Sequence, residues 1–141
     1  MLIKRHGFPI LAAMRVKRFT SSHGLEILVG QDDTSNDELT FRVARPNDFW
    51  LHVKGASGSH VILRSADGPP DRDSLREAAE LAAWFSKLRH AGKVAVNICR
   101  ARDVSKPRGV PPGQVSIRRA DKRLVRPRPP EQLQKQSSTS E

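Results

Sequence analysis

Hydrophobic and polar residues alternate in several short runs of this sequence, with the period of two that is typical of β-strands. Two such runs lie within residues 16–30, on either side of the turn-forming residues Ser21–Gly24. Another run covers 49–64 and is interrupted by a loop of small residues, and a fourth covers 93–104. We therefore expect these segments to pair in one sheet.

One longer stretch has the helical period instead. Its apolar residues recur at intervals of three and four. They are Leu75, Ala78, Ala79, Ala82 and Phe85. Ser74 and Glu77 match an S-x-x-E capping box, and Gly92 is a suitable stop. These patterns predict an α+β fold in which a mixed or antiparallel sheet is backed by one dominant helix over residues 74–91.

Two shorter elements are also predicted. Asn36 can cap a short helix, because Asp37 and Glu38 suit the positively polarised first turn of such a helix. Near the C-terminal end, apolar residues in the segments 114–118 and 123–126 predict a last hairpin.

The stretch 49–64, FWLHVKGASGSHVILR, carries the most distinctive chemistry. Its alternation puts the indole of Trp50, the imidazole of His52 and the ammonium of Lys54 on one face and three apolar side chains on the other. The glycines of the loop 55–59 permit a backbone in which successive amide N–H groups converge on an anion. We expect a polyanion to bind at this loop.

The charge of the chain also points to a polyanion. Its 141 residues form one domain by size, and they include 25 Lys and Arg against 15 Asp and Glu, a net charge of +10. Much of the excess lies in 100–128. No apolar run approaches the roughly 20 residues of a membrane span. We therefore expect nucleic acid as the partner and no membrane association.

The two ends of the chain differ in composition from its middle. We expect a flexible N-terminal extension over 1–13, a domain over 14–126, and a disordered tail over 127–141 that is rich in Pro, Gln and Ser. Either Met1 or Met14 is suitable as the start. The single Cys99 excludes an internal disulfide, suits a reducing cytoplasmic location, and is expected to be a small buried hydrophobe.

Ten residues are the candidate nucleic-acid contacts, and each has a structural alternative. Trp50 can stack on a base or pack in the core, and the two histidines can face the nucleic acid or support the loop. The cations can bind phosphates or be solvated surface charges. The set is Trp50, His52, Lys54, Ser57, Gly58, Ser59, His60, Arg64, Lys106 and Arg108. The histidines lack a third ligand at suitable spacing, so we expect no metal and no cofactor.

Four groups of residues resemble the NFACT-R domain, the RNA-binding module of the ribosome quality-control NFACT proteins. The resemblance covers 14–126. The groups are Ser21–Gly24 with Ile27–Gly30, Asn36–Leu39, Asp48–Lys54 with Gly58–Ile62, and Ser105–Pro107 with Gly109, Pro112 and Gly113.

This resemblance implies non-catalytic binding of structured RNA, namely tRNA and the large ribosomal subunit, in translation or ribosome quality control. In the full-length proteins the domain works beside an N-terminal domain and a long coiled coil, and the assembly recruits tRNA to stalled large subunits for non-templated tail synthesis. The resemblance transfers the RNA-binding surface to this chain, and a separate protein partner is the expected source of the other domains.

Two other function classes stay open at this point. A small hydrolase or nuclease could use His52 or His60 as a general base, with Lys54 stabilising the developing negative charge. An adaptor could bind ribosomal proteins and use its charge only for steering. No carboxylate pair or nucleophile has a spacing typical of an active site, so we expect a binding protein and no enzyme.

Overall fold

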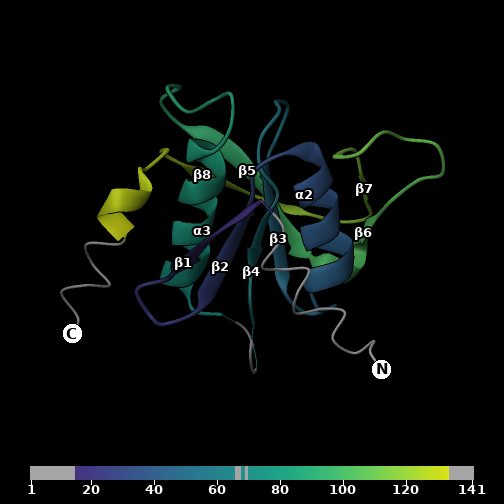
Figure 1. Ribbon diagram of the computed structural model, residues 1–141. Helices are drawn as coiled ribbons and strands as arrows, with labels where there is room; N and C mark the ends of the chain where they lie inside the picture. Colours follow the sequence, from purple (N-terminus) through teal and green to yellow (C-terminus); the bar gives the residue numbers. More distant parts are fainter. Residues whose placement is uncertain (1–14, 66–67, 69, 134–141) are drawn as a thin grey trace.

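A computed structural model describes residues 15–65, 68 and 70–133, and its centre is a sheet of six antiparallel strands (Figure 1). In spatial order the strands are β1 (Val16–Thr20), β2 (Glu26–Gly30), β4 (Val61–Leu63), β3 (Phe49–Val53), β5 (Val94–Arg100) and β8 (Asp121–Val125). This confirms the α+β prediction and selects the antiparallel form of the sheet. The expected N-terminal extension over 1–13 lies outside the described residues.

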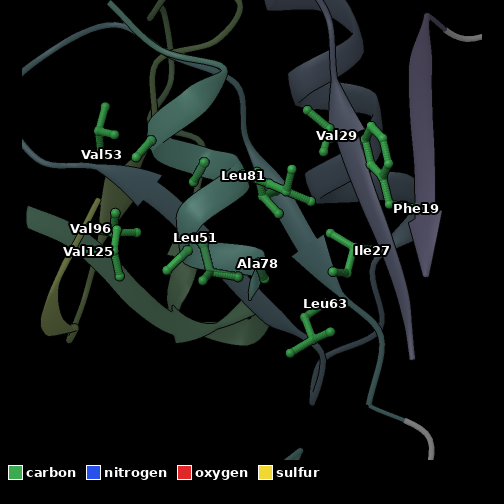
Figure 2. Close-up of a cluster of buried hydrophobic side chains, with 14 of the residues drawn as sticks. Phe19, Ile27, Val29, Leu51, Val53, Leu63, Ala78, Leu81, Val96 and Val125 are labelled. Carbon is green, nitrogen blue, oxygen red and sulfur yellow. The ribbon is translucent and has the colours of Figure 1, made fainter. Parts of the chain in front are cut away.

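One face of the sheet packs against α3 (Arg72–Trp84). Figure 2 shows Leu51 and Val53 of β3 in one cluster with Ala78 and Leu81 of the helix. The alanines let the helix backbone approach the strands closely, and burial of this apolar surface is the main contribution to stability. The predicted alternation of β3 therefore positions its apolar face as expected.

The opposite face of the sheet is also covered, by α2 (Asp33–Glu38) and the π-helical turn η2 (Leu39–Val43). The second core beneath them contains Trp50, Ile62 and Cys99. Burial raises the pKa of the Cys99 thiol to about 12, so this residue is the small buried hydrophobe that the sequence predicted. The sequence predicted one dominant helix against the sheet and did not predict that the short helix near residue 36 covers its other face.

The helix α3 differs from the predicted span 74–91 at both ends. Its N-cap is Asp71, whose carboxylate accepts from the Ser74 N–H at 2.8 Å. The predicted S-x-x-E capping box does not form, because the Glu77 carboxylate accepts from the Ser22 N–H instead. The helix stops before Phe85, because the chain then pairs with the loop after β3. Within the described ranges, no helix is both long and apolar enough to cross a membrane.

The short helix near residue 36 exists, but its cap is different. Asp32 is the N-cap of α2, and its carboxylate accepts from the Ser35 N–H at 2.7 Å. Asn36 is buried, and its side-chain oxygen accepts the His60 N–H. Asn36 therefore does not cap the helix, and instead joins it to the start of β4.

The last hairpin was predicted wrongly. The two predicted strands do not pair with each other. The first, β7 (Ser116–Ile117), pairs with β6 (Val104–Ser105), which follows the 3-10 turn η3 (Ala101–Asp103). The second, β8, pairs with β5. Burial explains the choice, because pairing with β5 places Val125 in the core beneath α3.

The predicted disordered tail begins too early at residue 127. Arg128 lies 3.8 Å from the Glu80 carboxylate of α3, and Leu133 is only 5% exposed within the main core. Residues 127–133 therefore belong to the folded domain, whereas 134–141 lie outside the described residues.

Truncation of Leu133 tests whether this segment contributes to folding. Leu133→Ala should lower the free energy of unfolding by about 2–3 kcal/mol, the usual cost of emptying a buried leucine site. Leu124→Ala is the matched control, because Leu124 is 66% exposed and its loss should cost less than about 0.5 kcal/mol. Urea titration measures both, and equal losses would show that 127–133 is not part of the core.

Candidate nucleic-acid interface

The loop between β3 and β4 is held by a short pairing with the chain after α3. Gly58 bridges Ser86, the Ser59 N–H donates to the Phe85 carbonyl at 2.9 Å, and the Lys87 N–H donates to the Ser57 carbonyl at 3.0 Å. A Cβ atom on Gly58 would lie 2.7 Å from the Ser86 Cβ, so glycine is required there. The two loops 54–60 and 85–93 therefore lie together at one end of the sheet.

The nest of converging amides predicted for 55–59 cannot include the Ser59 N–H, and the N–H of the following His60 is also taken. The N–H of Ser59 is taken by the Phe85 carbonyl and that of His60 by the Asn36 side chain. The loop instead presents the exposed Ser57 and the half-buried Ser59 beside an open hollow of about 400 Å³. Three cations from elsewhere in the chain line this hollow, namely Lys17, Lys87 and Arg89, and two acids of the α2 start, Asp32 and Asp33, line it as well.

The two paired loops themselves carry only positive charge. Segments 49–65 and 81–102 contain no Asp or Glu. Lys54, Lys87 and Lys93 are exposed, and none of them forms an ion pair with a described residue. Arg89 is ordered by its Nε–H, which donates to the Trp84 carbonyl at 2.7 Å, and by its guanidinium, which lies over the Trp84 ring. We call these four cations the sheet-end surface.

A second group of polar residues crosses three strands beside this surface. His52 pairs with Asn97, and Asn97 pairs with Lys122, so their side chains lie in a row on one face of the sheet. The Lys122 side chain approaches that of Lys54 and lowers the pKa of the Lys54 ammonium. Two neighbouring ammonium groups repel each other, and a bound phosphate would relieve that repulsion.

His60 is a structural residue. It is 2% exposed, its Nδ1 lies 2.9 Å from the Thr40 hydroxyl, and its carbonyl accepts from the Gly30 N–H. Burial and the neighbouring His52 lower its pKa to about 4, so the ring is neutral near pH 7. The proposed RNA contact at His60 is replaced by support of the loop, the alternative considered from the sequence.

Lys106 is also structural. Its ammonium donates to the carbonyls of Pro111 and Gln114 at 2.6 and 2.8 Å and lies 2.9 Å from the Asp37 carboxylate. The same carboxylate accepts the Gly113 N–H at 3.0 Å. Gly113 has a φ of +88°, which favours glycine, and the Asp33 carboxylate leaves no room for a side chain. Three acceptors surround the Lys106 ammonium, which gives it a structural role, and its phosphate contact stays a prediction.

Two further predicted contact residues have structural partners, and one of them is buried. Trp50 is 1% exposed, with its ring stacked on His52 and edge-on to His60, so it is a core residue and does not present a face to a base. Arg64 lies 3.1 Å from the buried carboxylate of Asp48. The structure therefore gives Trp50 the core role that was its alternative and gives Arg64 an ion-pair role, while a phosphate contact of Arg64 stays a prediction.

The remaining predicted residues divide into two places. Lys54, Ser57, Gly58 and Ser59 lie at the end of the sheet, with the half-buried His52 beside them. Arg108 is exposed on the loop between β6 and β7, which extends to the right of α2 in Figure 1, away from the loops at the top. The structure does not bring Arg108 together with the others.

The sequence prediction missed Lys17, Lys87, Arg89 and Lys93. The net charge of segment 65–99 is zero, because its acids balance its cations. This sum concealed that all the acids lie before residue 81, whereas Lys87, Arg89 and Lys93 lie after it. The acid-free run from Leu81 to Arg102 was the signal that could have found three of them.

One other cluster has the residue types of a metal site. Donor atoms of His23, Asp71 and Asp73 lie within 4.8 Å of one another. The His23 Nε2 lies 3.1 Å from the Asp73 carboxylate, which raises the pKa of the imidazole, and Asp71 caps α3. These ion-pair and capping roles account for the cluster.

The burial of His60 predicts that acid destabilises the fold. The unfolded chain takes up a proton at His60 near the ordinary pKa of 6.5, whereas the folded chain does so only at about 4. Lowering the pH from 6.5 to 5 should therefore reduce the free energy of unfolding by about 2 kcal/mol through this residue alone. Urea titration at both pH values measures the loss, and His60→Gln should diminish it. An unchanged pH slope in the variant would refute the assignment.

Removal of the Asp37 carboxylate tests the anchoring of the 105–114 loop. Asp37→Ala should lower the free energy of unfolding by about 1–2 kcal/mol, because it leaves the Gly113 N–H without its acceptor and removes the charge partner of Lys106, which keeps two carbonyl acceptors. The Gly113 amide should exchange faster with solvent. Glu38→Ala is the control, since Glu38 makes only a 3.9 Å contact with Arg42. Equal exchange in both variants would contradict the anchoring role.

Comparison with known proteins gives relatives that match most of this chain. The chain is 44% identical over 101 residues to the Rqc2 homolog RqcH of Bacillus subtilis (strain 168) and 40% identical over 118 residues to that of Streptococcus suis (strain 05ZYH33). These matches cover 72% and 83% of this chain but only 17% and 21% of the relatives, so the chain spans about a fifth of their length.

A solved structure has the same fold. It is the C-terminal part of the fibronectin/fibrinogen-binding protein from Streptococcus suis, with a TM-score of 0.79 and 36% identity over 86% of this chain and 48% of that one. The family model described as the NFACT protein RNA binding domain matches residues 15–119. Because that match covers most of the sequence, the chain belongs to the family of NFACT protein RNA binding domains.

Proposed function

We propose that this chain binds structured RNA, either tRNA or RNA of the large ribosomal subunit, through the sheet-end surface and without catalysing a reaction. The supporting observation is the charge there: four cations surround two paired loops that contain no acid. Elsewhere many cations are paired, as Arg64 is with Asp48. Unpaired cations on a rigid frame are suited to phosphates, which supply most of the affinity for nucleic acid.

Polar groups beside the cations support a preference for RNA over DNA. The hydroxyls of Ser57 and Ser59 and the amide of Asn97 are able to hydrogen-bond a 2′-hydroxyl, which DNA lacks. Since Trp50 is buried, base stacking on it is not part of this proposal.

The geometry favours binding over hydrolysis. His60 is buried, neutral and bonded to Thr40, so it is a poor general base for a bound substrate. Burial likewise lowers the pKa of His52.

We infer a cytoplasmic role in translation or ribosome quality control from the family and from the RqcH relatives. Because those relatives are several times longer, any part in recruiting tRNA to stalled large subunits would require other domains, which a protein partner is able to supply.

The test is an equilibrium titration with labelled tRNA and with a DNA duplex of matched charge, across a salt series. The triple variant Lys54→Ala, Lys87→Ala, Lys93→Ala should weaken tRNA binding at least tenfold. It should also reduce the slope of log affinity against log salt by about 2, because up to three phosphate contacts are lost. The wild type should prefer tRNA at every salt concentration.

The matched control is Arg42→Ala, Arg45→Ala, Arg72→Ala, which removes the same charge from exposed positions away from the two loops. It should bind tRNA within about threefold of the wild type, because only long-range attraction changes. Equal losses in both triple variants, or coincident curves for tRNA and DNA, would mean that the charge is generic. In that case an adaptor for proteins becomes the better account.

A further inference from the structure

A second basic groove lies between α3, β8 and the segment that follows it. The groove has a volume of about 460 Å³, and only one acid, Glu80, lines it. Five cations line it as well: Arg76, Lys93, Arg123, Arg126 and Arg128. Residues 120–133 lie beyond the match to the family model, which ends at residue 119.

The single acid of the groove is already neutralised. The Glu80 carboxylate lies 3.5 Å from the Arg76 guanidinium and 3.8 Å from that of Arg128. Lys93, Arg123 and Arg126 form no ion pair with any residue in the described part of the chain. The groove therefore retains a net positive charge that an anionic ligand would neutralise.

The frame of the groove is rigid. Arg123 belongs to a strand in register with β5, where it pairs with Val96. Two prolines at 127 and 129 line the groove, and the segment ends in the buried Leu133. Cations fixed on such a frame lose little conformational entropy when they bind a ligand.

The groove is continuous with the sheet-end surface. Lys93 belongs to both, and Val94, which follows it, pairs with Val125 at the end of β8. Along β8 the side chains alternate, so Lys122 points to the face of Lys54 and Arg123 to the face of α3. An anionic chain bound at the end of the sheet can thus continue along this edge strand into the groove.

We propose that the groove binds the sugar-phosphate backbone of the same RNA as a second contact, with Arg123 and Arg126 as its phosphate ligands. This inference rests on the proposed function and extends its footprint. A polyanion fits the groove better than an apolar ligand, because cations make up five of its eleven lining residues.

The test is tRNA binding by the double variant Arg123→Gln, Arg126→Gln across a salt series. Its affinity should fall about tenfold, and the salt slope should fall by about 1.5, because two phosphate contacts are lost. The control Arg45→Gln, Arg72→Gln removes the same charge at exposed positions outside the groove and should bind within threefold of the wild type. Thermal unfolding of each variant checks that the fold is intact.

A short RNA hairpin provides a second measurement. A hairpin too small to span both surfaces should bind the wild type and the double variant equally, whereas tRNA should distinguish them. If the double variant binds tRNA as the control does, the groove is not an RNA contact and the sheet-end surface acts alone. If it loses affinity for poly-glutamate but keeps tRNA binding, the groove serves an acidic protein, and the proposal is overturned.

Failure of the proposed function would look different. In that case the Lys54, Lys87, Lys93 variant would bind tRNA as well as the wild type, or the wild type would not bind tRNA at all. Loss of binding in that variant, with none in the Arg123, Arg126 variant, would overturn only the groove.

Discussion

The arrangement of the loops depends on one polar network, which is buried at Asn36 and partly buried at Asp37. The side chain of Asn36 accepts from the backbone of His60, and the neighbouring Asp37 accepts from Gly113 and pairs with Lys106. Polar groups removed from water are costly unless they are paired, so each bond in this network specifies its partner. The network joins α2 to the start of β4 and to the loop between β6 and β7, three segments far apart in the sequence.

This network gives structural roles to the most distinctive residues of the chain. Gly58 and His60 of the G-S-H turn fit the loop to its neighbours, and Lys106 and Gly113 fasten another loop to α2. The residues suited to RNA are plain surface cations that this frame positions. A resemblance that rests on these motif residues therefore indicates the fold more directly than it indicates which residues contact RNA.

The periodicity of the sequence was sufficient for most of the strands and for the apolar face of β3 that packs on α3. It was insufficient for the opposite face, where Trp50 is buried in the second core. It was also insufficient for the end of α3, where pairing of 85–87 with 57–59 overrides helix propensity, and for the pairing of β8, which follows from burial of Val125. The role of Lys106 depends on Asp37, about seventy residues away, and no local pattern reports such a distant partner.

The central claim is that RNA contacts the end of the sheet and not the loop fastened by Asp37. The most direct measurement is a map of backbone amide chemical-shift changes as a tRNA-derived hairpin is titrated into the protein. The account predicts the largest changes in 54–60 and 85–93, with little change at Lys106 and Gly113. Changes centred on 105–114, with 85–93 unaffected, would contradict it.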